Sequence, residues 1–255
     1  MGNRRALLES PRSSQNRDAP HGASLSLARV MHVHLRKDLS YCLAGGRIIF
    51  LDVRRDCYFR LSHELERKFL SCMKAGAASE ADAAALVESN IVTGDPRFAG
   101  TTRQLPGSPS RSALEQPAST TTLTPGVMAD VFCAVVMTRL QLRIRKLYDV
   151  LTELAAYRER RAPGAGGALS GTEMTRLLEE AALFRRARRY VPVEPRCLLD
   201  SLSLTRYLAG RGLHACTVFG VIGDPFAAHC WVQAEDLALN ETVGDAESFA
   251  PILAI

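Results

Sequence analysis

Short apolar runs alternate with polar turns through the first third of the chain. Three of these runs are rich in strand-favouring residues, and they lie at 40–43, 47–53 and 57–61. Runs of this kind, separated by a Gly-Gly pair and by a charged turn, are typical of an antiparallel meander. Helical patterns, each preceded by a serine that can cap it, follow at about 62–73 and 81–88. We therefore expect residues 28–94 to form a small winged-helix-like α+β module of three antiparallel strands and helices.

Two other stretches lack any periodic apolar pattern. Residues 1–27 are rich in Arg, Ser, Pro and Asn, and residues 95–125 are rich in Gly, Ser, Thr and Pro. Such compositions bury too little apolar surface to offset the entropy lost on ordering the chain. We therefore expect a disordered tail over 1–27 and a flexible linker between two domains over 95–125.

The second half of the chain begins with helical patterns and ends with strands. From about 127 to 158 the apolar positions predict one long helix with a single stripe, formed by Val136, Leu140, Ile144, Leu147, Leu151 and Leu154. Ser170 and Glu173 have the spacing of a capping box that opens another helix. Strands are predicted at 217–222, 228–233, 236–240 and 251–255. Residues 126–255 are therefore expected to form an α+β domain, with helices first and an antiparallel sheet after them.

A cysteine opens the helix that precedes these strands. Pro195 suits a first helical turn because it has no amide hydrogen there, and Gly210 and Gly212 end the helix after Ala209. Cys197 is therefore expected in the first turn, where unpaired amide groups and the helix dipole favour an anion. Because a thiol attacks as its thiolate, this position suits a nucleophile.

A histidine and an acid follow Cys197 in the order that thiol catalysis needs. His229 lies on the predicted strand 228–233, so it reaches Cys197 only if its face of that strand meets the end of the helix. Glu241 ends the next strand and is the first candidate to orient the imidazole. Asn240 and Asp236 remain as alternatives, although Asn240 points to the opposite face and Asp236 lies in a turn.

The remaining signals exclude several other kinds of site. A buried cysteine is usually a small hydrophobic residue, and we interpret Cys72, Cys133, Cys216 and Cys230 in this way. His229 and Cys230 are adjacent on a strand and point apart, and no ligand pair has the spacing of a zinc site, so no metal is expected. The chain also lacks the glycine-rich loops that bind nucleotides.

The composition of the chain indicates the cellular compartment in which it is expected. The chain has 255 residues, of which 47% are hydrophobic, and a formal net charge of +5 that favours an acidic partner only weakly. Its seven cysteines are dispersed and form no C-x-x-C pair, which favours a reducing cytoplasm over a secreted disulfide scaffold. No signal peptide and no apolar run of roughly 20 residues is present, so we expect a cytoplasmic protein without a membrane partner.

The C-terminal domain resembles the transglutaminase-like cysteine protease of lasso-peptide biosynthesis, the B protein. The resemblance is carried by Arg-Cys-Leu at 196–198, Gly-Val at 220–221, Ala-His-Cys-Trp-Val at 228–232, Leu-Asn-Glu-Thr at 239–242 and the tail Pro-Ile-Leu at 251–253. The N-terminal domain is similar to the precursor-peptide recognition element of such systems, through Tyr-Cys-Leu at 41–43 and Tyr-Phe at 58–59. The resemblance therefore implies a transglutaminase/papain-like fold in the second domain.

The same resemblance implies a leader peptidase of ribosomally made peptides. By carry-over, Cys197 is the nucleophile, His229 the base and Glu241 the third residue, where the family usually has Asp. The leader of the precursor peptide is expected to add as a strand against the helix at 80–88 and against Cys57, Tyr58, Phe59, Arg60 and Leu61. The second partner is an asparagine-synthetase-like lasso cyclase, which is expected to use ATP, whereas this chain has no cofactor of its own.

Three alternatives remain. The protease half can be inactive, which would leave a leader-binding scaffold, or it can be a transglutaminase that joins side chains by the same thiol chemistry. A winged-helix regulator that binds DNA is the third. The helix at 80–88 carries Glu80, Asp82 and Glu88 and no Lys or Arg, which argues against DNA contact, so no nucleic-acid partner is expected.

Overall fold

The computed structural model describes residues 8–9, 30–100, 105–116, 121–163 and 169–255. The chain folds as two compact units that divide between residues 102 and 103. We call them the N-terminal and C-terminal units. Each combines helices with antiparallel strands, which confirms the predicted α+β class. None of the helices in the described ranges is long and apolar enough to cross a membrane.

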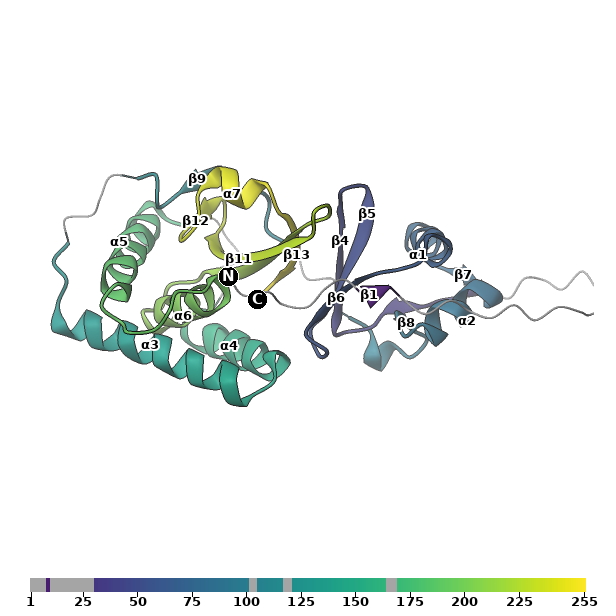
Figure 1. The fold of residues 1–255 in the computed structure, drawn as a ribbon, viewed down its shortest axis with the longest axis horizontal. Helices are drawn as coiled ribbons and strands as arrows, with labels where there is room; N and C mark the ends of the chain where they lie inside the picture. The colour runs from purple at the N-terminus through teal and green to yellow at the C-terminus, as the bar shows by residue number, and fades with distance from the viewer. Residues whose placement is uncertain (1–7, 10–29, 101–104, 117–120, 164–168) are drawn as a thin grey trace, which may run out of the picture. The chain divides into compact units, whose positions relative to one another are not determined.

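A small sheet with the strand order β1-β6-β5-β4 forms the centre of the N-terminal unit (Figure 1). The predicted meander is confirmed: β4 (Leu39–Ala44), β5 (Arg47–Asp52) and β6 (Cys57–Arg60) are antiparallel neighbours. On the outer edge of β6, β1 (Leu8–Glu9) pairs in parallel. The backbone of these two residues is thus part of a sheet, although they belong to the tail that was expected to be disordered. The rest of 1–27 lies outside the described residues.

Two helices and two short ladders complete this unit. The helices are α1 (His63–Ala75) and α2 (Glu80–Glu88); the ladders pair β2 (Val30–Met31) with β7 (Ala78–Ser79), and β3 (His34–Leu35) with β8 (Val92–Thr93). Ser62 and Ser79 cap the helices by accepting backbone N–H groups, as predicted. A 3₁₀ turn, η1 (Pro96–Phe98), follows.

Aromatic rings fill the core of the N-terminal unit. The Phe50 ring is fully buried between Phe59 and Phe69, with centroids 5.2 and 5.1 Å away. Burial of each such side chain contributes about 1.5–3 kcal/mol. Phe59 is therefore part of the core, and the outer side of β6 offers mainly its backbone.

The C-terminal unit places a central helix between other helices and a sheet. Its helices are α3 (Pro125–Ile144), α4 (Leu147–Arg161), α5 (Gly171–Arg188), α6 (Cys197–Gly210) and α7 (Val243–Glu247). The sheet has the order β13-β10-β11-β12-β9, from β10 (Cys216–Ile222), β11 (Ala227–Ala234), β12 (Leu237–Ala238), β13 (Ala250–Ala254) and β9 (Arg111–Ser112). This confirms the prediction of helices followed by an antiparallel sheet.

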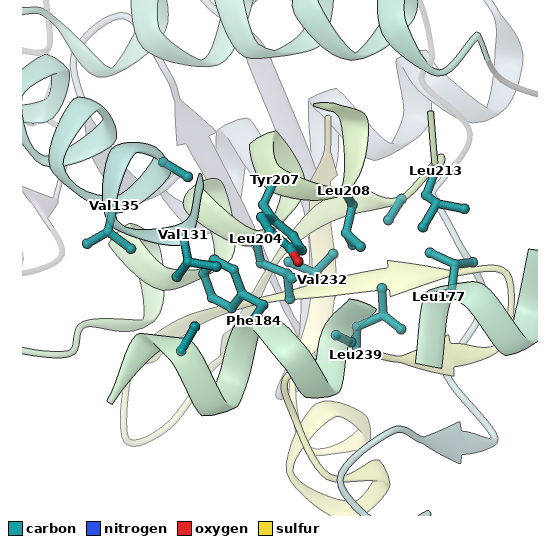
Figure 2. Close-up of a cluster of buried hydrophobic side chains, with 14 of the residues drawn as sticks. Val131, Val135, Leu177, Phe184, Leu204, Tyr207, Leu208, Leu213, Val232 and Leu239 are labelled. Atoms are coloured by element: carbon teal, nitrogen blue, oxygen red, sulfur yellow. The ribbon is translucent and has the colours of Figure 1, made fainter. Parts of the chain in front are cut away.

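Helix α6 is the centre of the main core. Figure 2 shows Leu204, Tyr207 and Leu208 of α6 among side chains from other elements, namely Val131, Val135, Leu177, Phe184, Leu213, Val232 and Leu239. Because α6 packs against α3, α4, α5 and β11 at once (Figure 1), its position relative to the sheet is fixed. The same contacts fix the position of Cys197, the first residue of α6.

The prediction of one long helix over 127–158 is wrong. The chain is extended at Arg145, with φ −123° and ψ 158°, and separates α3 from α4. Glu153 of α4 accepts hydrogen bonds from Gln141 and Arg145, which ties the two helices together across the break. Leu140 and Ile144 are exposed, because α3 buries a different face, with Val131 and Val135.

The stretch expected to be a flexible linker is partly ordered. Strand β9 pairs in parallel with β12, and Arg111 forms an ion pair with Asp236 at 2.6 Å. Ser112 donates a hydrogen bond to the backbone carbonyl of Glu241 at 2.6 Å. These polar contacts order a segment without apolar periodicity, which is why the hydrophobic pattern missed it. Residues 101–104 and 117–120 lie outside the described ranges.

Candidate active site

Helix α6 begins at Cys197, which is exposed. The residue before it, Arg196, is extended, and no side chain caps the helix. The amide groups of the first turn therefore keep their hydrogen-bonding capacity and their partial positive charge near the thiol. This is the position that the sequence predicted for Cys197.

A buried arginine holds the chain that leads into α6. Arg188, at the end of α5, donates to Asp200 at 2.6 Å and to the carbonyl oxygens of Val191 and Val193 at 3.3 and 2.9 Å. Its guanidinium therefore joins α5, the connecting segment and the first turn of α6. Burial raises the pKa of Asp200, and the Arg188 guanidinium opposes this rise. Arg188 thus helps to place Cys197.

The imidazole of His229 is held on β11 by an acid and two aromatic rings. Its Nε2 lies 2.6 Å from Oε2 of Glu241. The ring centroids of Trp231 and Phe249 lie 6.4 and 5.3 Å from that of His229. Glu241 is fixed in turn, because its Oε1 accepts the N–H of Thr242 at 3.0 Å. The acid can therefore set the orientation of the imidazole.

Neighbouring groups on β11 favour the thiolate form of Cys197. Hydrogen bonding from the Cys230 side chain, the His229 imidazole and the Cys230 backbone lowers the pKa of the Cys197 thiol. Since Glu241 occupies Nε2 of His229, Nδ1 is the ring nitrogen that faces the sulfur. The Cys197–His229–Glu241 arrangement is thus one connected chain of hydrogen bonds.

The sulfur reaches both His229 and Cys230 because α6 meets β11 at its edge. Within a strand, the N–H and C=O of one residue point to the same side. The Cys230 N–H donates to Cys197, and the Cys230 carbonyl accepts from Ser201 at 3.1 Å, one helical turn further along α6. The sequence argument required the His229 face to meet the helix end; in the structure the helix also contacts the backbone of β11, where Ser201 donates to the Cys230 carbonyl.

These contacts make Cys197 and His229 an ion pair. The pKa of Cys197 is lowered to about 4, chiefly by the hydrogen bond from the Cys230 thiol and then by His229. The pKa of His229 is raised to about 9 by its hydrogen bonds to Cys197 and Glu241. The pKa of Glu241 is lowered by His229. Between about pH 4 and pH 9, the site therefore holds a thiolate beside an imidazolium.

The two alternative orienting residues make other contacts. Asn240 accepts the N–H of Val232 at 2.7 Å and donates to Ser201 at 3.0 Å, so it fastens α6 to the sheet. Asp236 pairs with Arg111, and this lowers the pKa of Asp236 to about 2. Of the three candidates, all within the described part of the chain, Glu241 is the one that lies against His229.

Two features of the site have no clear sequence signal. Cys230 was interpreted as a hydrophobic residue, since strand alternation turns it away from His229; its contact with Cys197 arises from the edge-on helix. Gly220, which pairs with His229 across β10 and β11, leaves room for rings. A Cβ there would lie 2.8 Å from both Phe249 and Trp231. A single glycine in an apolar strand does not by itself predict such close packing.

The residues proposed for leader binding lie on and beside β6. Leu61 is buried and Phe59 stacks on Phe50, although Phe59 is itself half-buried, as are Cys57, Tyr58 and Arg60. They do not form one continuous side-chain surface. What β6 presents is a backbone edge, on which Leu8 is paired with Phe59. On α2, Val87 is an exposed apolar side chain.

A thiolate at the start of α6, an imidazolium on β11 and a carboxylate between β12 and α7 are the groups that thiol catalysis requires. Residues 134–254 match the family model of the transglutaminase-like superfamily. This range includes Cys197, His229 and Glu241, so the C-terminal unit carries a transglutaminase-like domain that is compatible with cysteine-protease-type activity. No curated protein and no solved structure matches the chain.

Proposed function

We propose that this protein is the leader peptidase of a lasso-peptide pathway. It binds the leader of a ribosomally made precursor and hydrolyses the bond between leader and core. The observation that carries the proposal is the hydrogen-bonded chain from Cys197 through His229 to Glu241 on a transglutaminase-like domain. The resemblance of the N-terminal unit to a precursor-recognition element supports the choice of substrate.

The ion pair accounts for both halves of the hydrolysis. The Cys197 thiolate attacks the carbonyl carbon that joins leader to core, and the His229 imidazolium gives its proton to the departing amine of the core. The leader is then held as a thioester on Cys197. Neutral His229 next takes a proton from water, whose oxygen attacks the thioester and releases the leader as a carboxylic acid. Glu241 stabilises the imidazolium in both steps.

Recognition of the leader rests on the outer edge of β6. The pairing of β1 with β6 supports this, because it means that the edge accepts an added strand. Backbone hydrogen bonds would supply affinity, and side chains such as Val87 of α2 would supply selectivity. In this arrangement the leader is bound away from the bond that is cut, so the sequence of the core is left free to vary.

The cleavage product defines the partner. The freed amine of the core is what a separate asparagine-synthetase-like cyclase would join to an Asp or Glu side chain, and we assign the use of ATP to that cyclase. We place both enzymes in the cytoplasm, where free thiols persist. The seven cysteines are dispersed and form no C-x-x-C pair, which supports that compartment.

A transglutaminase that joins side chains is the second candidate, because the superfamily match fits it equally well. Product analysis distinguishes the two. A peptidase yields two fragments whose masses sum to that of the precursor plus one water, whereas a transglutaminase yields one linked product and ammonia.

The direct test uses the full chain, a candidate lasso precursor peptide and a lasso cyclase. Replacement C197A is expected to abolish cleavage while leader affinity, measured by fluorescence anisotropy, stays unchanged. C133A is the matched control, since Cys133 is also exposed but lies on α3. Unchanged cleavage by C197A would contradict the peptidase proposal. Loss of leader binding by a folded C197A chain would contradict the assignment of leader binding to the N-terminal unit.

A further inference from the structure

A chain of hydrogen bonds crosses from α6 to the sheet one helical turn after Cys197. The Ser201 hydroxyl donates to the backbone carbonyl of Cys230 at 3.1 Å and accepts a hydrogen bond from the side-chain amide of Asn240 at 3.0 Å. The side-chain oxygen of Asn240 accepts the backbone N–H of Val232 at 2.7 Å. Ser201 is fully buried, so these are the partners on which its hydroxyl depends. Ser201 is thereby joined to β11 directly at Cys230 and through Asn240 at Val232.

The hydrogen-bonding groups around residue 240 require an amide there. The backbone N–H of Val232 is a donor, so it needs an acceptor opposite it. The single proton of Ser201 is used at the Cys230 carbonyl, so the Ser201 oxygen needs a donor. Asparagine offers one acceptor and one donor group at the end of a short side chain, whereas the carboxylate of an aspartate offers acceptors alone. Asn240 therefore serves this network and not the imidazole.

Each polar residue of the network is close in sequence to one residue of the proposed site, namely Ser201 to Cys197, Cys230 to His229 and Asn240 to Glu241. Ser201 is four residues after Cys197 on α6, about 6 Å along the helix axis and on the same face. His229 is the neighbour of Cys230 on β11, about 3.3 Å away along the strand. Because these separations are short and both elements are regular, a slip of α6 along β11 would shift the sulfur relative to the imidazole by a similar distance.

We propose that Asn240 and Ser201 are positioning residues of the thiol site, which set the distance between the Cys197 sulfur and the His229 imidazole by fixing α6 on β11. The inference deepens the proposed function: it rests on the thiol–imidazole chemistry of that function and is independent of which peptide is cleaved. Neither side chain exchanges a proton in the hydrolysis, so both act through the reacting pair. Because misplacement of a reacting group by about 1 Å can cost about 10²-fold in rate, loss of the network should lower kcat by up to about 10²-fold and leave KM unchanged.

Two other buried hydroxyl groups of α6 provide matched controls. Ser203 is as buried as Ser201, but it donates within its own helix, to the carbonyl of Leu199 at 2.6 Å. Thr205 forms a hydrogen bond with Thr217 of β10 at 2.7 Å, so it also joins α6 to the sheet, about two turns away from the sulfur. S203A therefore measures the loss of a buried hydroxyl as such. T205V measures the loss of a hydrogen bond between helix and sheet at a distance from the site.

The first measurement is alkylation of Cys197 by iodoacetamide in the full chain between pH 5 and pH 8, followed by peptide mass spectrometry. In S201A the sulfur is held less closely to the imidazole, so its rate at pH 5 should fall by roughly 3–10-fold and should rise toward pH 8. N240D, which keeps the acceptor for Val232 but loses the donor to Ser201, should show the same change. S203A and T205V should alkylate as the wild type does, even where thermal unfolding shows that they are equally destabilised.

The second measurement is single-turnover cleavage of a candidate lasso precursor peptide, in which S201A and N240D should lower kcat and leave KM unchanged. Unchanged Cys197 alkylation in folded S201A would overturn the positioning role. Equal losses in S201A and T205V would also overturn it, because the cause would then be general destabilisation. Should S201A fail to fold, N240D decides by the same readout. Slower alkylation in S201A without any cleavage by the wild type would support the positioning role while contradicting the peptidase proposal, so the two fail separately.

Discussion

The two regions with proposed roles, the Cys197 site and the β6 edge, are built on different principles. The site depends on three side chains, each fixed by a segment that packs elsewhere: α6 in the helical core, β11 in the sheet, and the connection from β12 to α7. The β6 edge depends on backbone, since Phe59 points into the core and the outer pairing is made by main-chain groups. Side-chain chemistry of this kind tolerates almost no substitution, whereas backbone recognition tolerates many.

The largest effect is expected when the base is removed. In H229A the thiolate loses a hydrogen-bond donor, and the departing amine loses its proton source. Cleavage is expected to fall by about 10²–10⁴-fold, the usual size of general acid–base catalysis. Single-turnover assays of precursor cleavage measure this, and leader affinity should be unaffected. A parallel loss of leader affinity would show that the two regions are not independent.

The second change tests the orienting acid. Activity needs Cys197 ionised, above about pH 4, and His229 protonated, below about pH 9. E241Q removes the carboxylate that helps to raise the pKa of His229, so the alkaline limb of the pH profile should move to lower pH. The rate should also fall, by up to about 10⁴-fold, the loss that follows when the acid orienting a catalytic histidine is neutralised.

E241D keeps a carboxylate and provides the matched control. The family that the sequence resembles usually has Asp here, so this variant should retain an alkaline limb close to that of the wild type. A pH profile of E241Q identical to that of the wild type would exclude Glu241 from the site.

The third change tests how tightly the site is supported. G220A places a Cβ 2.8 Å from the Trp231 ring and from the Cβ of Phe249, two residues whose rings lie near His229. Overpacking of this kind costs about 1–3 kcal/mol of unfolding free energy, which thermal or denaturant unfolding measures. G244A on α7 is the control, since a Cβ there meets no atom within 4 Å. Equal stability of the two variants would contradict the close packing beneath His229.

The smallest expected effect is at the β6 edge. A leader strand that uses this edge must displace β1. Deletion of residues 1–10 should therefore lower the Kd of the leader by roughly a few-fold, because a short pairing no longer competes for the edge. The catalytic rate at saturating precursor should not change. Weaker leader binding after the deletion would instead make the N-terminal segment part of the leader site.

The same contrast explains what the sequence could predict. Elements with local signals were found: the capping serines of α1 and α2, the Ser170–Glu173 capping box and the start of α6 at Cys197. Features that depend on tertiary contacts were not. The break at Arg145 is stabilised by Glu153 on the next helix, and β9 is ordered by bonds to Asp236 and Glu241.

The features of the candidate site also separate into those that the sequence predicts and those that depend on tertiary contacts. Residue types and their order along the chain point to Cys197, His229 and Glu241, because thiol catalysis needs these groups in connected positions. The role of Cys230 cannot be read from strand alternation, which turns it away from His229. It follows from α6 meeting β11 edge-on, so that the Cys230 amide and thiol reach the sulfur together.

The central claim is that Cys197 is an activated thiolate, and its alkylation rate tests this most directly. Intact protein is treated with iodoacetamide between pH 5 and pH 8, and labelling of Cys197 and of the exposed Cys133 is followed by peptide mass spectrometry. With the pKa of Cys197 near 4, its labelling should be nearly independent of pH over this range and faster than that of Cys133 at pH 5. A Cys197 rate that rises about tenfold per pH unit, as for an ordinary thiol, would contradict the account.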